Sequence, residues 1–329
     1  MSTNIPSTTS EIIEQVEIQD QSNNVFFGRQ DYISILFRSI GGELYKLRRR
    51  TLSKVLSIIG IAIVVLSLIG ISIPAFIAST STDPAAQQLL SNFGALLHLP
   101  GSLTFVGSIA NFIATILLII LAGTIVGGEY TSGTIRVMLS RGPSRVQYLL
   151  TKIGTLLICT LISIIVLLII GLFVGSLLNL LLHQPVDTST MNGAWITHAL
   201  LYVLTLALSL FFYTILALFI ATLGKSSAAG IAGALVWWFL ESLLSSILTA
   251  VGSISTGTLA AFLKAVPTYL PGTNLSALIT NQTTDLSASA SASQPGAITD
   301  VHAILVIIVY VAIFLGISFW VQESRDVTN

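Results

Sequence analysis

Charged residues are scarce in this chain. Only 9% of its 329 residues are Asp, Glu, Lys or Arg, whereas 53% are hydrophobic and the mean hydropathy is +0.91. A soluble domain carries about 25% charged residues, so the scarcity excludes a soluble globular fold and predicts a polytopic membrane protein. The 14 basic and 14 acidic residues cancel, which leaves no overall positive surface to attract nucleic acid.

The chain also lacks the residues of common catalytic sites. Its single cysteine, Cys159, excludes an intrachain disulfide and lies in an apolar run, as a packing residue does. There is no HExxH, no GxSxG and no pair of intramembrane aspartates, and no histidine has metal-ligand spacing. Gly224-Lys225-Ser226 looks like the end of a phosphate-binding loop, but Phe219 stands where that loop needs glycine. We therefore expect no enzymatic activity, metal or cofactor in this chain, and we interpret Lys225 as a determinant of topology.

Long apolar runs are abundant, and six of them can cross a hydrocarbon core of about 30 Å at about 1.5 Å per residue. The runs are Leu56–Ala78, Leu103–Gly127, Ile153–Leu182, Ile196–Gly224, Ser227–Val251 and Ala303–Val321. The predicted fold class is all-α, with a six-span transmembrane domain over residues 55–321 and both termini on one side.

Basic residues are distributed very unevenly between the two sides. Thirteen of the 14 fall in the N-terminal segment, in the loop 127–152, at Lys225 or at Arg325, and only Lys264 falls on the other side. By the positive-inside rule, both termini and the loop 127–152 are cytoplasmic. We expect a multi-pass protein of the cell membrane.

The N-terminal region has two parts. Residues 1–30 are polar, which predicts a disordered cytoplasmic tail, and residues 322–329 form a second cytoplasmic tail. Residues 31–54 predict an amphipathic interfacial helix with an apolar side of Ile33, Leu36, Phe37, Ile40, Leu44 and Leu47. Its membrane anchor is a basic cluster of Lys46, Arg48, Arg49, Arg50 and Lys54. The helix either only anchors the chain or also contacts a cytoplasmic partner.

The last outer loop, over residues 252–302, is unusually long. Its first half is apolar enough to form short helices against the outer membrane face, whereas its Ser/Ala-rich second half is typical of a flexible linker.

One acid lies well inside a span. Glu241, in GIAGALVWWFLESLL, shares a helical face with Gly230, Ala234 and Trp237. The small residues favour close packing against another span. An intramembrane carboxylate is a functional candidate, and the alternative is a structural acid that is hydrogen-bonded to a neighbouring helix.

The segment Gly127–Lys152 is the only sizeable basic segment between two apolar runs. The sequence predicts a short helix after Glu129, with Tyr130, Ile135, Met138 and Leu139 along one side, ended by Gly142 and Pro143 before a second helix opens near Ser144.

The residues of this segment follow a recognisable order: Glu129, Ser132, Gly133, Thr134, Arg136, Leu139, Pro143, Ser144, Arg145 and Lys152. This order resembles the first cytoplasmic loop of ABC-2-type transporter permease subunits, and the six-span layout is similar to theirs. The resemblance implies that two permease subunits form the pathway and that separate cassette ATPase subunits, which bind ATP and Mg, dock below.

The resemblance also implies roles for individual residues. The ATPase-coupling residues would be Glu129, Tyr130, Gly133, Thr134, Arg136, Leu139, Pro143, Ser144 and Arg145. Our own hypothesis is that Glu129 and Arg145 hold the two ends of the segment, through a contact of Glu129 with Arg145 or Arg136. The resemblance favours export and implies an elbow role for the N-terminal helix. The alternatives are a secondary transporter or channel, which would show more intramembrane ionisable residues, and a membrane scaffold without transport.

Overall fold

The computed structural model describes residues 33–97, 99, 101–133, 144–182, 192–286 and 298–324. Over these residues the chain is helical and has no β-strand, which confirms the all-α prediction. The expected tail over residues 1–30 lies outside the described residues. Of the tail expected over residues 322–329, the first three residues continue helix α11 and the others lie outside the described residues.

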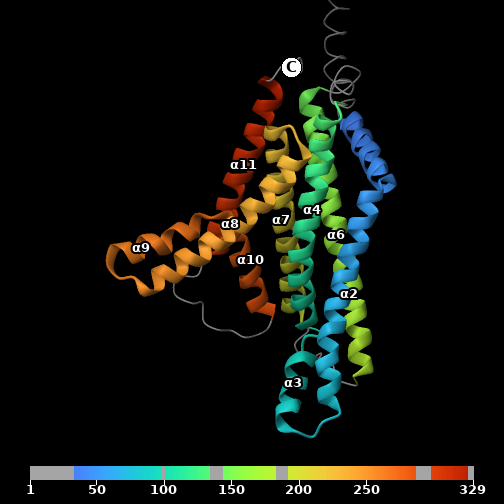
Figure 1. Ribbon diagram of the computed structural model, residues 1–329, viewed down its shortest axis with the longest axis vertical. Coiled ribbons are helices and arrows are strands. Elements are labelled where there is room, and N and C mark those ends of the chain that lie inside the picture. Colours follow the sequence, from blue (N-terminus) through green and yellow to red (C-terminus); the bar gives the residue numbers. More distant parts are fainter. Residues whose placement is uncertain are drawn as a thin grey trace, which may run out of the picture.

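Six of the described helices are long and apolar enough to cross a membrane, so the chain is a multi-pass membrane protein (Figure 1). They are α2 (Thr51–Ser79), α4 (Gly101–Thr131), α6 (Arg145–Leu181), α7 (Gly193–Gly224), α8 (Ser227–Ile254) and α11 (Asp300–Ser324). Each contains one predicted apolar run almost entirely. The helices extend beyond the runs because a helix continues into the polar interface after its apolar stretch has ended.

Four shorter elements connect the spans: α3 (Pro84–Gly94), α9 (Gly257–Ala265), the 3₁₀ helix η1 (Val266–Tyr269) and α10 (Pro271–Leu286). Asp83 caps α3 by accepting a hydrogen bond from the main-chain N–H of Ala85. A further helix covers residues 33–49 and is separated from α2 by Arg50 alone.

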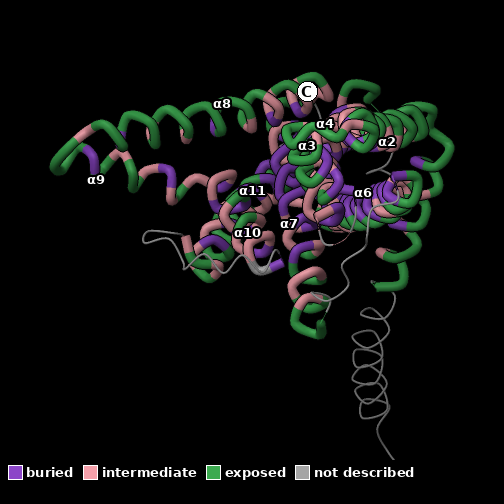
Figure 2. Tube along the Cα trace, turned by 90° about the horizontal axis from the view of Figure 1, so that it is seen from below, coloured by how far each residue is buried: buried purple, intermediate pink, exposed green. Residues whose placement is uncertain are grey.

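The core lies between α4 and α7. In its most apolar stretch α7 is 61% buried and α4 50% buried, against 11% for α8. Figure 2 shows the buried positions concentrated where these two helices pass through the bundle. The residue 33–49 helix, the end of α4, the start of α6 and the end of α11 lie together at one end of the bundle, which we call the terminus end, and α3 lies at the other (Figure 1).

The residue 33–49 helix buries part of the apolar side that the sequence predicts, and a carboxylate with it. Ile33 and Phe37 are exposed, at 52% and 69%, whereas Ile40, Glu43 and Leu47 are buried. These three share a face because they are spaced three and four residues apart. This helix therefore packs on the bundle through a face that includes a carboxylate.

The predicted short helices between α8 and α11 are present as α9 and α10, and α10 is packed within the helix bundle. It packs alongside α7, α8 and α11, and Gly272 in its first turn contacts Glu241. Glu241 lies 14 residues into α8, or about 21 Å along it. Helix α10 thus begins within the thickness of the bundle, because a buried carboxylate is there to receive its first free N–H.

Candidate functional site

Helix α4 extends further into the segment 127–152 than the sequence predicts. Glu129 and Tyr130 do not start a new helix but belong to the last turn of α4, which ends at Thr131. Gly133 follows with φ +68°, a left-handed conformation that glycine adopts without steric cost. The coupling candidates Thr134, Arg136, Leu139 and Pro143, with the predicted short helix that carries them, lie outside the described residues.

The second helix begins where the sequence predicts. Ser144 is the N-cap of α6: its hydroxyl accepts a hydrogen bond from the N–H of Gln147 (3.2 Å), and the Gln147 side chain accepts one from the N–H of Ser144 (3.0 Å). This reciprocal capping box satisfies two N–H groups that a helix start leaves free. It fixes where α6 begins and therefore where Arg145 and Lys152 lie.

A buried ion cluster lies one and two turns further along α6. Lys152 is only 1% exposed, and its Nζ lies 2.5 Å from Oε1 of Glu129 and 2.8 Å from Oε2 of Glu43. Tyr148 donates its hydroxyl hydrogen to Oε2 of Glu129 at 2.6 Å. The exposed ammonium of Lys46 lies 2.7 Å from Oε1 of Glu43. The cluster therefore ties the residue 33–49 helix, α4 and α6 together through charge-assisted hydrogen bonds.

Among the described residues, the cluster joins two acids to two lysines. Glu43 and Glu129 supply two negative charges, and Lys152 and Lys46 supply two positive ones. Burial raises the pKa of Glu43, but the charges of Lys152 and Lys46 and the hydrogen bonds from them oppose it, and the pKa lies below its ordinary value. The geometry thus favours the charged form of this carboxyl.

A second set of contacts joins the same region to α11. Tyr130 donates its hydroxyl hydrogen to the side-chain oxygen of Gln322 at 2.7 Å. Arg145 donates from Nη1 to the main-chain oxygens of Gln322 and Glu323, at 3.1 and 3.0 Å. The last carbonyls of a helix have no intrahelical partner, and a cation there complements the helix dipole. Both helices that flank the basic segment are therefore attached to the last span.

Three of these residues were not singled out from the sequence: Glu43, Tyr148 and Gln322. Glu43 offered a signal, because it lies three residues after Ile40 and four before Leu47, on one face of an otherwise apolar helix side. Tyr148 and Gln322 offered none, since their partners are 19 and 192 residues away. The predicted contact of Glu129 with Arg136 lies outside the described residues.

The basic anchor residues are mostly on the surface. Arg48, Arg49, Arg50 and Lys54 are exposed, and Arg49 lies over the ring of Tyr45 at 5.3 Å. Exposed basic side chains at the start of a span suit contact with anionic lipid headgroups.

Glu241 is buried between α8 and α10 and is partnered. Its Oε2 accepts the indole N–H of Trp237 at 3.0 Å, and its Oε1 accepts the main-chain N–H of Gly272. Gly230 and Ala234 on the same face are buried, and a methyl group at Gly230 would lie 2.6 Å from Cβ of Ala221. The small residues therefore pack closely against a neighbouring span, here α7, as the sequence suggested.

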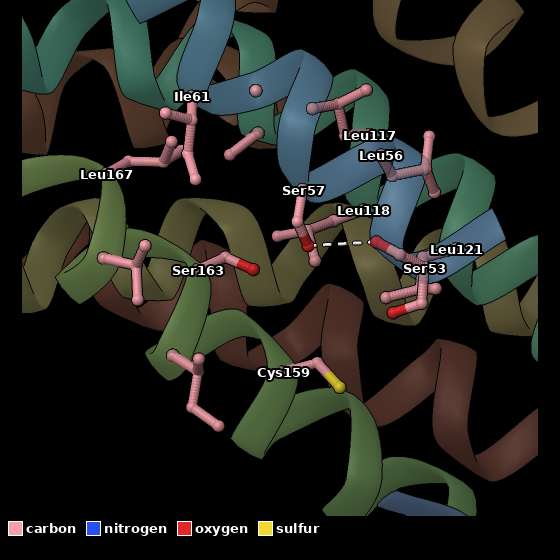
Figure 3. A pocket seen from close by; sticks show the side chains of 14 residues that line it. Ser53, Leu56, Ser57, Ile61, Leu117, Leu118, Leu121, Cys159, Ser163 and Leu167 are labelled. Carbon is pink, nitrogen blue, oxygen red and sulfur yellow. Dashed lines mark hydrogen bonds between the residues drawn. The ribbon is translucent and has the colours of Figure 1, made fainter. Parts of the chain in front are cut away.

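Pockets open between the described spans at two places that bear on function. One, of about 260 Å³, is lined by Glu241 and residues of α7, α8 and α10. The other, of about 180 Å³, lies between α2, α4 and α6, and Ser57, Cys159 and Ser163 line it (Figure 3). Ser57 turns its hydroxyl back to the carbonyl of Ser53, so this second lining is mainly apolar and suits a hydrocarbon chain.

Comparison with known proteins identifies the family of this chain. No curated protein matches it. A protein-family model described as "Protein of unknown function (DUF2705)" matches residues 101–328, from the first residue of α4 to the last residue but one. Because this match covers more than half of the sequence, the chain belongs to the DUF2705 family.

Proposed function

We propose that this chain is the permease subunit of an ATP-binding cassette transporter, and that the segment 127–152 receives the push of a separate ATPase. The observation that carries the proposal is the set of contacts around Lys152 and Arg145. They connect the two helices that flank the segment to the residue 33–49 helix and to α11. A force applied to the segment would move four helices together.

The assembly that follows from the proposal has two kinds of partner. A cassette ATPase would bind ATP and Mg and dock at the terminus end, and a second permease subunit, either identical or related, would complete the pathway. Export is the direction that we propose, on the resemblance of the loop alone. The chain needs an external ATPase because it has no phosphate-binding loop of its own.

Replacement of Arg145 by alanine should uncouple the ATPase. Without the guanidinium the start of α6 loses its hold on the end of α11, while the spans keep their apolar packing. We expect the variant to insert normally and to copurify with the cassette ATPase proposed as its partner. Its rate of transport-coupled ATP hydrolysis in proteoliposomes should fall at least about fivefold. Arg48→Ala is the matched control, since Arg48 is exposed and forms no salt bridge within the described residues.

The outcomes separate the alternatives. Affinity purification from native membranes that recovers no cassette ATPase would leave the coupling proposal without a partner. If Arg145→Ala keeps its full transport-coupled ATP hydrolysis, the segment 127–152 only determines topology and does not couple the ATPase. A secondary transporter is the second candidate, favoured by the start of α10 against the buried Glu241, a geometry that suits ion or substrate sites. Transport driven by an ion gradient without ATP would support it.

We further propose that the terminus end faces the cytoplasm, because 13 of the 14 basic residues fall in segments assigned to that side. Ser132 and Ser91 are exposed near opposite ends of the bundle. In a Cys159→Ala background, a membrane-impermeant maleimide added to intact cells should label Ser91→Cys and spare Ser132→Cys until the cells are opened. The reverse pattern would show that the protein has the opposite orientation. Labelling of both cysteines from outside would contradict a membrane crossing by α4, the span that lies between them, and with it the six-span arrangement.

A further inference from the structure

The pocket beside Glu241 differs from the pocket between α2, α4 and α6 because its lining is largely polar. Tyr213 of α7, Trp238 of α8 and hydroxyl side chains from both α8 and α10 line it together with the carboxylate. Ser245 and Thr273 bridge the two helices, with 3.0 Å between their hydroxyl oxygens. Ser242 and Ser276, which also line it, are exposed, so the pocket is open to its surroundings.

Among the described residues that line the pocket, the only charged group is the carboxylate of Glu241. None of the described residues that line it is basic, and no described salt bridge includes Glu241. The carboxylate accepts one hydrogen bond on each oxygen, and it lies at the N-terminus of the 16-residue helix α10. Both features stabilise an anion. A carboxylate has about four lone-pair sites, so it retains capacity for further donors or a cation.

Aromatic rings surround the same carboxylate. The rings of Tyr213 and Trp238 meet edge to face at 6.5 Å, and Trp238 also contacts Phe112 at 5.5 Å. Ring faces attract cations, most strongly where water is excluded. They also offer apolar surface to the rest of a ligand.

Resting on the transport function proposed above, we propose that this pocket binds the cationic group of an amphiphilic ligand, with Glu241 as its counter-charge. The ligand must be amphiphilic because Glu241 lies 14 residues from the start of α8, about 21 Å along a span. The absence of basic residues from the described lining disfavours an anionic headgroup. The chemical class is therefore an organic cation with an apolar body.

The test compares two ions of nearly equal size and opposite charge. The purified chain, in nanodiscs of zwitterionic phosphatidylcholine and without ATPase or ATP, is titrated with tetraphenylphosphonium and with tetraphenylborate. We expect Glu241→Gln to weaken phosphonium binding by roughly tenfold or more and to leave borate binding equal or tighter. Asp83→Asn is the matched control, since it removes one exposed carboxylate at the N-cap of α3 and keeps the oxygen that caps the helix. This variant should change neither affinity.

Glu241 also accepts a hydrogen bond from the start of α10, so Glu241→Gln could change the structure as well as the charge. A second variant therefore keeps the carboxylate. Ser242→Lys places an ammonium at the exposed edge of the pocket, and it should weaken phosphonium binding by roughly tenfold and favour borate. Unchanged phosphonium binding in Ser242→Lys, or equal loss of both ions in this variant, would overturn the proposal. Because the assay contains no ATPase, its result is independent of whether the Arg145 coupling experiment succeeds.

Discussion

Lys152→Met should destabilise the protein more than any other single change in the cluster. The substitution leaves Glu43 and Glu129, each 6% exposed, without the ammonium that lies 2.8 and 2.5 Å from them. Removal of one partner from a buried ion pair costs about 3–5 kcal/mol, because the remaining charge stays desolvated. The measurement is size-exclusion chromatography in detergent, which follows the melting of the purified protein through the loss of the soluble peak. We expect most of the Lys152→Met variant to be lost from this peak as aggregate.

Two further variants make the result specific. Lys46→Met removes the other cation of Glu43, but its side chain is 50% exposed, so the cost should be at most about 1 kcal/mol. The triple variant Glu43→Gln, Glu129→Gln, Lys152→Met removes all three buried charges and should regain much of the lost stability, since neutral replacements of a buried ion network are often tolerated. If the triple variant is as unstable as Lys152→Met, packing of the lysine stem, and not its charge, holds this region together.

The dependence on pH provides an independent check. In the wild type the pKa of Glu43 is lowered, so its stabilisation is complete above the unfolded pKa of about 4.3 and is lost as pH falls through the folded value. In Lys152→Met the ammonium that chiefly opposes the effect of burial is gone, so burial should raise the pKa of Glu43. The free energy of unfolding of this variant should then increase as the pH falls and the carboxylate is protonated. The deficit of this variant relative to the wild type should therefore shrink as the pH falls from about 7 towards the unfolded pKa of about 4.3. A deficit that is constant over this range would argue against charge as its cause.

Gly127→Ala should separate α8 from α4. A methyl group at Gly127 would collide with main-chain atoms of Ser226 and Ser227, which cannot rotate away. The neighbouring contact is also tight, since a methyl group at Gly123 would lie 2.9 Å from the main-chain nitrogen of Ile231. Overpacking of this kind costs about 1–3 kcal/mol, and a main-chain collision belongs at the upper end of that range.

Helix α8 cannot shift alone in response to this collision. Only Lys225 and Ser226 connect it to α7, and Lys225 already adopts a left-handed conformation with φ +48°. A displaced α8 would carry Glu241 away from Gly272 and loosen the start of α10. We therefore expect a lower melting temperature for the purified protein together with weaker binding of tetraphenylphosphonium.

Gly128 is the matched control. It is the next residue of the same helix, and a methyl group there would meet nothing within 4 Å. Alanine is a better helix former than glycine by about 1 kcal/mol, so Gly128→Ala should raise stability slightly. Equal melting temperatures for the two alanine variants would show that α4 and α8 tolerate separation and that their close approach contributes little.

Much of the architecture follows from local properties of the sequence. A membrane span needs only a sufficient length of apolar residues, so six apolar runs predict six helices without knowledge of their neighbours. The N-cap of α6 was predictable for the same reason, because Ser144 and Gln147 are three residues apart and satisfy each other locally. The small-residue face of α8 was recognisable because Ser226, Gly230 and Ala234 recur every four residues.

The tertiary structure alone decided which polar groups meet. Lys152 pairs with a carboxylate 109 residues away, and Arg145 reaches carbonyls 177 and 178 residues away. Such partners depend on the rotation and depth of packed helices, which a periodic pattern does not specify. The depth of α10 was decided in the same way: its composition predicts a short helix, but its position within the bundle depends on the buried Glu241, a partner 31 residues earlier in the chain. The sequence by itself therefore determined the membrane class, the spans and the distribution of basic charge, because these depend on each residue's own free energy of transfer. The charge cluster and the polar pocket depend on contacts between distant segments, and only the packed helices fix those.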